Sequence, residues 1–385
     1  MWNELGSEGR VALIARPELD TGIGRYVQML DRGLREAGVD ATTVSPSIPR
    51  LPNASYRALR LMGRDLDAFL RNYPLWSAYP DAEIYHLTGQ TLASLLLFRR
   101  PKGDVVVTVH DLFPYVLRRS PRGRALYGTD RTYYRLVIAG LKRADHLIAN
   151  SEYTKQCLID VLRLPPEHIT VIYSGLDHGL FRPQPVPSGI FDRYGLAQGR
   201  RYLIYVGSED PRKNLTTLLR ALVDIRRAHP SVELIKVGRS HCEPERLRLL
   251  DLAKQLDIED AIHFLELVPD ADLPLLYNLA ELYVTPSTEG FGFTVLEAMA
   301  CGTPVICAKT GSSPEIVGDA GVQVAPLDSE ALGAAVIRLL EDDEERSHLK
   351  EVGRTHAARF NWPAAIRATI DVYQGRGSAH SAAML

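Results

Sequence analysis

Short apolar runs alternate with amphipathic stretches along the whole chain, and this alternation limits the possible folds more than any other feature. In the first half, strands are expected in RVALIA, ATTVSP, AEIYHLT, VVVTVHD, HLIANS and ITVIYSG. The second half restarts the series with RYLIYVG, VELIKVG, IHFLEL, ELYVTPS, TPVICAK and GVQVAP. Strands that alternate with helices form parallel sheets covered by helices. The pattern therefore predicts an α/β protein with two doubly wound, Rossmann-like domains.

The length of 385 residues also favours two domains, because a single core rarely grows beyond about 300 residues. The proline-rich stretch RPQPVPSGIF (residues 182–191) is the expected linker. We assign residues 1–181 to an N-terminal domain and residues 182–360 to a C-terminal domain. Residues 361–385 are expected to form a helix that crosses back to the N-terminal domain, followed by a flexible tail. Ligands of such domains bind at the carboxyl edges of the strands, so a cleft between the domains is expected.

Composition favours a cytoplasmic protein. The four cysteines are scattered without a CxxC pair, which argues against a zinc site and against a disulfide scaffold. The longest apolar run, LASLLLF, is far shorter than the roughly 20 residues that span a bilayer. Residues 50–131 hold 13 basic and 7 acidic residues. We favour a solvated surface and a core-facing helix over residues 56–70. The alternative is a basic face that meets an anionic acceptor or the inner face of the membrane.

The stretch STEGFGFTVLEAMACGTPVI (residues 287–306) places two carboxylates around a strand-to-helix corner. A strand is expected over ELYVTPS, and a helix from about Thr294 onward. Gly290 and Gly292 fall at the corner, where a glycine backbone bends freely and lets a ligand approach closely. Glu289 and Glu297 flank this corner, so the pattern predicts a ligand site there.

A second corner lies at VGSEDPRKN, where the predicted strand ends at Gly207. Asn214 is expected to cap the following helix. Arg212 and Lys213 would then stand beside a helix start, whose free amides favour anions. A solvated basic pair is the better explanation of this motif alone. Two such corners at one sheet edge favour a phosphate site.

The first domain contributes Gly22 and Gly24, which are expected to precede a helix. A dinucleotide fingerprint would need a third glycine where Val27 stands, and an acidic residue after the next strand. Both are missing, so a nicotinamide-dependent enzyme is disfavoured. A backbone loop that admits a phosphate or a sugar remains the expectation.

Together these residues resemble a known family. The motif Glu289-x7-Glu297 within EGFGFTVLEAMACGTPV, joined to YVGSEDPRKN, VHDLFP and ANSEYTK, is similar to family 4 of the retaining, nucleotide-sugar-dependent glycosyltransferases. The similarity runs in the right order over nearly the whole chain. It implies the GT-B fold and transfer of a hexose, with mannose from GDP-mannose as the first choice. The acceptor would be a hydroxyl of a sugar or of a lipid-linked saccharide.

Other activities remain open at this point. UDP-glucose or a UDP-N-acetylhexosamine is the alternative donor. A nucleotide-sugar epimerase would change the donor without an acceptor, and a non-catalytic binder would show no turnover. The intact PRKN turn together with the two glutamates favours catalysis.

The resemblance also implies roles for individual residues. Glu297 binds the ribose hydroxyls of the donor, Glu289 holds hydroxyls of the transferred sugar, and Lys213 binds the diphosphate with Arg212 as its neighbour. Many relatives carry a second cation where this chain has Ser208. Backbone amides meet the sugar and the diphosphate around Phe291, Gly292, Phe293 and Thr294. Packing in the core is the alternative for both phenylalanines.

His110 ends a predicted buried strand, and the family places a histidine at this position close to the donor sugar. A purely structural histidine is the alternative. Asp111 is expected to cap the backbone.

No metal and no bound cofactor are expected, because fixed cations stabilise the leaving diphosphate. The two DxD strings, at residues 65–67 and 270–272, are interpreted as incidental. The expected partners are a nucleotide-sugar donor and a saccharide or lipid-linked acceptor, and nucleic acid is not expected. The resemblance implies retention of the anomeric configuration. With no evident nucleophile, attack from the face that the phosphate leaves is the hypothesis.

Overall fold

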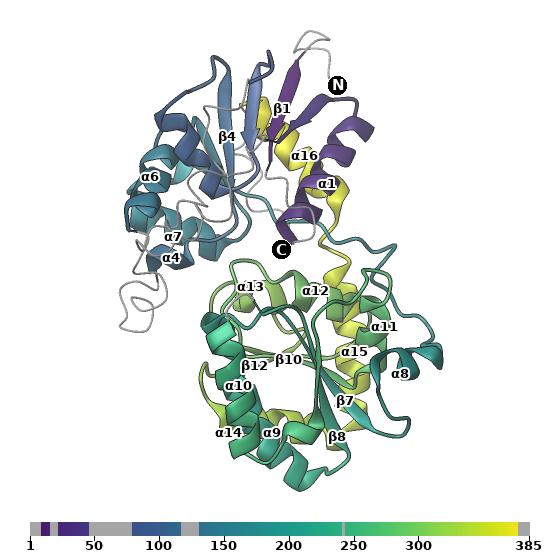
Figure 1. The fold of residues 1–385 in the computed structure, drawn as a ribbon. Helices are drawn as coiled ribbons and strands as arrows, with labels where there is room; N and C mark the ends of the chain where they lie inside the picture. Colours follow the sequence, from purple (N-terminus) through teal and green to yellow (C-terminus); the bar gives the residue numbers. More distant parts are fainter. Residues whose placement is uncertain (1–8, 16–21, 46–78, 117–130, 241–242, 376–385) are drawn as a thin grey trace. The chain divides into compact units, whose positions relative to one another are not determined.

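The computed structural model describes residues 9–15, 22–45, 79–116, 131–240 and 243–375, and it forms two compact units (Figure 1). Unit 1 comprises residues 1–175 and 362–385, and unit 2 comprises residues 176–361. The chain therefore enters unit 2 at Leu176, ahead of the proline-rich stretch, which belongs to unit 2. The expected helix over residues 56–70 and the expected tail after residue 375 lie outside the described residues.

Unit 1 contains a parallel sheet of six strands in the order β2-β1-β3-β4-β5-β6. Its strands are β1 (Arg10–Ile14), β2 (Asp40–Val44), β3 (Ile84–Leu87), β4 (Asp104–Val109), β5 (His146–Ala149) and β6 (Ile169–Val171). The described helices are α1 (Gly22–Glu36), η2 (Gln90–Leu97), α4 (Phe113–Val116), α6 (Arg131–Leu141), α7 (Glu152–Leu162), η5 (Pro166–His168) and α16 (Trp362–Tyr373). Each strand predicted in the first half of the sequence is present.

The C-terminal helix α16 belongs to unit 1, where it lies beside α1 (Figure 1). Its residues Trp362, Ala365 and Ile366 join the buried cluster formed by β1, α1 and their neighbours. Gly33 of α1 allows this close packing, because a Cβ atom there would lie 2.6 Å from Cγ1 of Ile366. The sheet of unit 1 therefore depends on a helix from the far end of the chain.

Unit 2 contains a second parallel sheet of six strands, in the order β12-β11-β10-β7-β8-β9. Its strands are β7 (Arg201–Val206), β8 (Val232–Val237), β9 (Ile262–Leu265), β10 (Leu282–Thr285), β11 (Val305–Ala308) and β12 (Val322–Val324). Every strand predicted in the second half is found. The prediction of two doubly wound α/β domains is confirmed.

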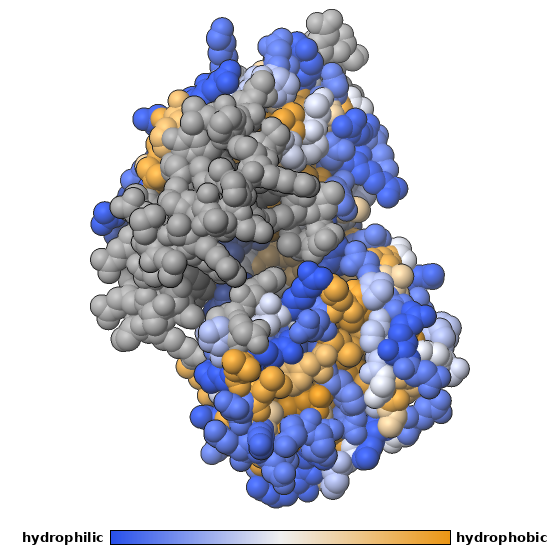
Figure 2. Space-filling model, in the orientation of Figure 1, coloured by the Kyte–Doolittle hydropathy of each residue, from blue (hydrophilic) through white to orange (hydrophobic). Residues whose placement is uncertain are grey.

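Helices cover both faces of the sheet in unit 2, with α9, α10 and α14 on one side and α11 and α15 on the other (Figure 1). The helices are α8 (Gly189–Tyr194), η6 (Pro211–Lys213), α9 (Leu215–Ala228), α10 (Glu243–Gln255), η7 (Glu259–Ala261), α11 (Leu273–Leu279), α12 (Phe293–Ala300), α13 (Ser313–Val317), α14 (Ser329–Glu341) and α15 (Asp343–Ala357). Their apolar faces and the central strands form one continuous core. Figure 2 shows hydrophilic side chains over much of the drawn face of unit 2, with apolar patches between them.

Strands β7 and β10 are neighbours in the sheet, although β8 and β9 lie between them in sequence. The chain runs outward from β7 to β9 on one side and from β10 to β12 on the other. This reversal of strand order is a topological switch point, where open α/β sheets bind their ligands at the carboxyl ends of the strands. The fold of unit 2 thus selects the loops after β7 and β10 as its site.

Among the described residues, no helix is both long and apolar enough to cross a bilayer.

Candidate active site

The loops that follow β7 and β10 bring three of the predicted site residues together. Nζ of Lys213 donates a hydrogen bond to Oε1 of Glu289, and Nη1 of Arg212 lies 3.5 Å from Oε2 of the same carboxylate. Arg212 also donates to the backbone oxygen of Thr288 at 3.1 Å. The side chains of Lys213 and Glu289 are 13% and 14% exposed, so this ion pair lies mostly shielded from water.

The charges of this cluster favour an ionised carboxylate at Glu289. Burial raises the pKa of Glu289, but the charges of Lys213 and Arg212 outweigh burial and hold that pKa below its usual value. Asp210 lies 3.9 Å from Nε of Arg212, so two carboxylates, Glu289 and Asp210, stand against the two cations. Because the groups are shielded, their field acts with less screening than in water. The N–H groups of Lys213 and Arg212 are hydrogen-bond donors that an anion such as a diphosphate could accept from.

The loop after β11 fixes the backbone of Glu289. Ser312 donates its backbone N–H to the carbonyl of Glu289 at 3.0 Å, and its hydroxyl reaches the carbonyls of Glu289 and Phe291 at 3.1 and 2.7 Å. Gly311 pairs with Glu289 as an isolated parallel bridge. A Cβ atom at Gly311 would lie only 2.4 Å from the Glu289 carbonyl, so the approach requires glycine. The position of Glu289 is therefore set by three neighbouring strands, β7, β10 and β11.

Helix α12 begins at this corner, as predicted. Gly292 stands at its N-terminus with φ 106°, a left-handed conformation that favours glycine. The first amides of a helix have no acceptor within the helix, so those of Phe293 and Thr294 are available to an anion. Phe291 is 4% exposed and packs against Phe293 with ring centroids 4.8 Å apart. The side chain of Phe291 therefore serves the core, while Phe293 is half-buried.

Glu297, the predicted partner of the ribose hydroxyls, is a buried residue. It is 2% exposed, and its Oε2 accepts a hydrogen bond of 3.0 Å from the hydroxyl of Tyr277. The reason is that Glu297 is the fifth residue of α12, on the part of the helix that packs against α11. Glu297 thus belongs to a hydrogen-bonded pair distinct from the Lys213–Glu289 pair.

The loop after β7 departs from prediction at Asn214. Its backbone is left-handed (φ 54°), and its side chain makes no capping hydrogen bond to α9. An N-cap needs an extended backbone to aim its oxygen at the first amides, and the 3-10 turn η6 removes that geometry. Asp210 caps η6 instead, accepting from the N–H of Arg212 at 2.9 Å. Ser208 contributes its carbonyl, which accepts from the Tyr205 hydroxyl at 3.2 Å.

A buried ion triad anchors the same loop. Oε1 of Glu209 lies 2.6 Å from Nζ of Lys236 on β8, and its Oε2 lies 2.7 Å from Nε of Arg246 on α10. The Glu209 side chain is fully buried, and that of Lys236 is 1% exposed. Burial raises the pKa of Glu209, but hydrogen bonds from Arg246 and Lys236 outweigh burial and lower it. The triad holds the loop of Arg212 and Lys213 to β8 and α10.

His110 lies in unit 1 at the carboxyl end of β4, and it is 7% exposed. Its Nε2 lies 2.9 Å from the backbone oxygen of Thr88. A carbonyl oxygen only accepts, so Nε2 carries the hydrogen. Burial lowers the pKa of His110, which keeps the ring neutral at pH 7 and makes Nδ1 an acceptor. Asp111 accepts from the N–H of Phe113 at 3.4 Å, which confirms its predicted backbone role.

Gly22 and Gly24 lie inside α1 rather than in a loop before it, because the helix begins at Gly22. Residues 16–21, where such a loop would lie, are outside the described residues. Gly24 is buried within the first turn of the helix. Both glycines therefore belong to a helix start at the carboxyl side of β1.

In the two DxD strings, Asp272 is paired with protein groups, and the first string lies outside the described residues. Asp272 pairs with Arg193 at 2.5 Å and accepts from the Tyr194 hydroxyl at 2.7 Å, so it joins α8 to α11. Asp65 and Asp67 lie outside the described residues. The described part of the chain contains no group of three or more His, Cys, Asp or Glu side chains placed to hold a metal ion.

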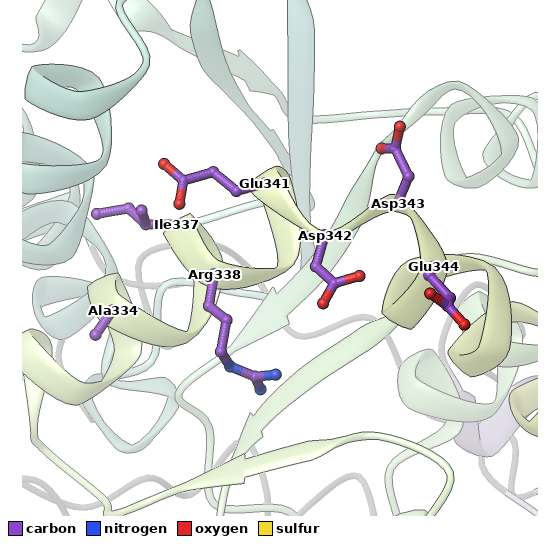
Figure 3. A pocket seen from close by; sticks show the side chains of 7 residues that line it. All are labelled: Ala334, Ile337, Arg338, Glu341, Asp342, Asp343 and Glu344. Atoms are coloured by element: carbon purple, nitrogen blue, oxygen red, sulfur yellow. The ribbon is translucent and has the colours of Figure 1, made fainter.

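A shallow depression of about 730 Å³ lies where α14 ends and α15 begins (Figure 3). It is lined by Ala334, Ile337, Arg338, Glu341, Asp342, Asp343 and Glu344. Four carboxylates against one guanidinium disfavour an anionic ligand. Asp342 caps α15 by accepting from the N–H of Glu345 at 2.8 Å. The acidic run therefore stabilises a helix start, and none of the predicted site residues lines the depression.

The sequence did not reveal the residues that hold the site in place. Gly311 and Ser312 could have been suspected, because they follow a predicted strand of the same sheet. Tyr277 carries no such signal, since it lies within a helix that offers no motif. Its partner is twenty positions away in the sequence.

Both units match family models of known proteins. The family model described as "Glycosyltransferase Family 4" matches residues 21–180, and the one described as "Glycosyl transferases group 1" matches residues 189–356. The chain is 31% identical to O-antigen chain mannosyltransferase B of Escherichia coli, over 92% of this chain and 96% of that protein. It is 32% identical to D-inositol 3-phosphate glycosyltransferase of Segniliparus rotundus, over 61% of this chain and 54% of that protein.

Solved structures share the fold at lower identity. Sucrose-phosphate synthase from Thermosynechococcus elongatus matches with a TM-score of 0.75 at 23% identity, over 96% of this chain and 99% of that one. Anabaena HepE in complex with UDP and glucose matches with a TM-score of 0.73 at 18% identity, over 96% and 100%. The two doubly wound units and these likenesses define a glycosyltransferase of the GT-B fold. With both family models and a relative over nearly its whole length, the chain belongs to glycosyltransferase family 4 and is a hexosyltransferase.

Proposed function

We propose that this enzyme transfers mannose from GDP-mannose to a hydroxyl of a saccharide or lipid-linked saccharide, with retention of the anomeric configuration. The donor assignment is supported by the E. coli relative named a mannosyltransferase, which aligns over nearly the whole chain. The observation that carries the chemical part is the pairing of Lys213 and Arg212 around Glu289 at the switch point of unit 2.

In this proposal the cations stabilise the leaving group. Breaking the bond between the anomeric carbon and the diphosphate builds negative charge on a phosphate oxygen. Lys213, Arg212 and the first amides of α12 offer preorganised positive charge to that oxygen. Because Lys213 is held by Glu289 and Arg212 by the Thr288 carbonyl, little reorganisation accompanies the reaction.

Glu289 has a second part in the proposal, which is to accept hydrogen bonds from hydroxyls of the transferred sugar. Its lowered pKa keeps it ionised, and an ionised carboxylate accepts without competing as a donor. Glu297 accepts from the ribose hydroxyls, and the neutral ring of His110 orients the sugar. The acceptor oxygen attacks from the side that the diphosphate leaves.

The proposal includes neither a metal nor a bound cofactor, since Lys213 and Arg212 supply fixed positive charge. Removal of divalent metal ions with a chelator is therefore expected to leave turnover unchanged. Loss of turnover with chelator and its recovery with manganese would overturn this part of the proposal.

A thermal-stabilisation screen with GDP, UDP, ADP and their sugar derivatives tests the donor assignment. GDP and GDP-mannose are expected to raise the melting temperature more than UDP and UDP-glucose at equal concentrations. Stabilisation by UDP compounds alone would replace GDP-mannose with a UDP-hexose. Incubation of the preferred donor with a panel of saccharides, followed by product analysis, then distinguishes transfer from epimerisation and from binding without turnover.

A further inference from the structure

Four large tyrosine side chains are buried in unit 2, where phenylalanine would fill the same space. Tyr202, Tyr205, Tyr277 and Tyr283 are each at most 1% exposed. A buried phenol hydroxyl costs free energy unless it finds a hydrogen-bond partner. The partner of each hydroxyl therefore indicates why tyrosine stands at the position.

The hydroxyl of Tyr277 holds the carboxylate of Glu297. Tyr277 lies on α11, and its Oη donates to Oε2 of Glu297 at 3.0 Å. Burial and the negative charge of Glu297 raise the pKa of Tyr277 well above its usual value, so the phenol keeps its hydrogen at neutral pH. A hydrogen bond from a neutral donor to a carboxylate is stronger than one between neutral groups. The bond thus restricts the direction of a carboxylate that lies 2% exposed.

The hydroxyl of Tyr283 contacts α12, the helix of Glu297, about one turn closer to its N-terminus. Its Oη lies 2.7 Å from Oγ1 of Thr294, and Tyr283 belongs to β10. Thr294 and Glu297 are three residues apart, so they lie on neighbouring positions of one face of α12. The rings of Tyr277 and Tyr283 lie 5.9 Å apart between centroids. Two adjacent phenols therefore contact the start of α12 through polar atoms of two predicted donor-binding residues.

Tyr202 shows the contrasting case. Its hydroxyl donates to the backbone oxygen of Ala197 at 2.9 Å and accepts from the N–H of Ala197 at 2.7 Å. Tyr202 is the second residue of β7, at the end of the strand opposite to the switch point. Its hydroxyl therefore satisfies the backbone groups of Ala197 and has no contact with the predicted site.

We propose that Tyr277 and Tyr283 are positioning residues of the donor site: the Tyr277 hydroxyl fixes the Glu297 carboxylate for the ribose, and the Tyr283 hydroxyl supports it by holding Thr294 on the same face of α12. The inference rests on the proposed function, in which Glu297 accepts from the ribose. A phenylalanine in place of Tyr277 would fill the core but remove a donor from the buried carboxylate. The carboxylate would then turn toward other donors and lose its direction toward the ribose.

Titration calorimetry on the full chain tests the inference with two ligands, GDP and inorganic pyrophosphate. Both carry the diphosphate, but only GDP carries the ribose. In Tyr277→Phe the Kd for GDP is expected to rise about 10-fold, while the Kd for pyrophosphate stays within about 2-fold of wild type. In Tyr283→Phe a rise of about 3-fold for GDP is expected, since its partner is neutral. A general loosening of the site would instead weaken both ligands together.

Tyr202→Phe is the control, because its side chain is as buried as those of Tyr277 and Tyr283 and its hydroxyl has no contact with the predicted site. Its Kd values for both ligands are expected to stay within about 2-fold of wild type. A double-mutant cycle adds a second test: in the background of Glu297→Ala, Tyr277→Phe should no longer change the Kd for GDP. Should Tyr277→Phe fail to fold, Tyr283→Phe, paired with Thr294→Val, tests the same claim independently.

The outcomes separate this inference from the proposed function. If the wild-type chain binds neither GDP nor UDP, the proposed function fails and the inference fails with it. If it binds UDP instead, only the choice of base fails, and UDP replaces GDP in the same series because both carry ribose. If wild type binds nucleotide and Tyr277→Phe and Tyr283→Phe match wild type, the inference alone is overturned. Equal weakening of nucleotide and pyrophosphate would also overturn it.

Discussion

At the scale of single residues, Lys213 is the side chain on which the proposed chemistry depends most. Replacing it with alanine removes the cation that pairs with Glu289, while Arg212 stays 3.5 Å from that carboxylate. We expect Lys213→Ala and Glu289→Ala each to lower turnover about 10²–10³-fold. Because Arg212 still compensates the buried charge in Lys213→Ala, its free energy of unfolding should fall by only about 1–2 kcal/mol.

Steady-state kinetics with GDP-mannose, alongside urea denaturation, measures both effects. Lys254→Ala on α10 is the control, since this lysine is exposed and belongs to the same unit. It should match wild type in both measurements. Wild-type turnover in Lys213→Ala would remove this lysine from the site.

A different residue, His86, makes the stability of unit 1 depend on pH. Its Nε2 lies 2.7 Å from Oγ1 of Thr108 and its Nδ1 lies 2.6 Å from the hydroxyl of Tyr373. Burial, aided by the charge of His110, lowers the pKa of His86 from 6.5 to about 3. Between pH 6.5 and 3 the unfolded chain therefore binds a proton that the folded chain does not. Stability falls as the pH drops through this window, by about 1.4 kcal/mol per pH unit at most.

Replacing His86 with glutamine should remove this contribution. Hydrogen exchange of peptides from β3 and β4, measured between pH 8 and 5, reports the local stability of unit 1. Above pH 7.5 the two proteins should show parallel pH dependence, since the imidazole is neutral in both states. Below pH 6.5 the variant should lose less protection per pH unit than wild type. Equal slopes in that range would contradict the assignment.

At the scale of elements, the loop after β11 holds Glu289 through a close backbone contact that only glycine permits. Gly311 has φ 62°, and a Cβ atom there would overlap the Glu289 carbonyl at 2.4 Å. We expect Gly311→Ala to lower turnover about 100-fold by shifting Glu289. Gly195→Ala is the matched control, because Gly195 has φ 64° and no atom within 4 Å of the added Cβ.

Gly195→Ala should lose about 1–2 kcal/mol of unfolding free energy, because it forces a left-handed backbone, and Gly311→Ala should lose more, because its Cβ also overlaps the Glu289 carbonyl. Only Gly311→Ala should lose turnover beyond the loss of folded protein. Measuring activity per folded molecule, after thermal denaturation has fixed the folded fraction, separates the two effects. If Gly195→Ala lost as much turnover as Gly311→Ala, the contact with Glu289 would not be the cause.

The ion triad of Glu209 joins the loop after β7 to β8 and α10. Glu209→Ala would leave Lys236 charged and unpaired at 1% exposure, which should cost about 3–5 kcal/mol of stability. Replacing the pair together, as Glu209→Leu with Lys236→Met, should cost less, because the fully buried ammonium is removed with its partner and Arg246 keeps Glu266 at 3.4 Å. Guanidinium denaturation of both variants tests this. A double variant less stable than Glu209→Ala would show that the triad stabilises by more than charge pairing.

The helices and strands could be predicted from the sequence far better than the contacts between them. The twelve strands of the described residues were all predicted, because each is an apolar run bounded by turn residues, a local property. The corner at Gly292 was also predicted locally. The Asn214 cap was wrong because a preceding 3-10 turn changed the backbone at that residue. The pairing of Tyr277 with Glu297 could not be predicted, since it depends on how α11 packs against α12, and packing is not local.

At the scale of the whole molecule, the chain leaves unit 1 at Gly175 and returns to it at Trp362. These two residues meet in the structure: a Cβ atom at Gly175 would lie 2.3 Å from the backbone nitrogen of Trp362. Unit 2 is thus inserted into unit 1 between two adjacent points of the chain. Its core cluster draws only on residues of unit 2, whereas the core of β1 and α1 includes Trp362, Ile366 and Val372 of α16.

This connectivity predicts how the chain can be divided. Residues 176–361 should fold alone, and they should bind GDP, because Arg212, Lys213, Glu289 and Glu297 all lie within them. Residues 1–175 alone should not unfold cooperatively, since they lack the helix that covers α1. Joining residue 175 to residue 362 through two or three glycines should restore cooperative unfolding, because so short a linker spans adjacent ends at little entropic cost.

Circular dichroism during urea denaturation distinguishes the three proteins, and calorimetry with GDP tests residues 176–361. Each fragment should lack transferase activity, because the proposed function needs both His110 of unit 1 and Lys213 and Arg212 of unit 2. Cooperative unfolding of residues 1–175 without α16 would contradict the role given to that helix. Failure of residues 176–361 to bind GDP, in a chain whose intact form binds it, would mean that nucleotide binding also requires groups from unit 1.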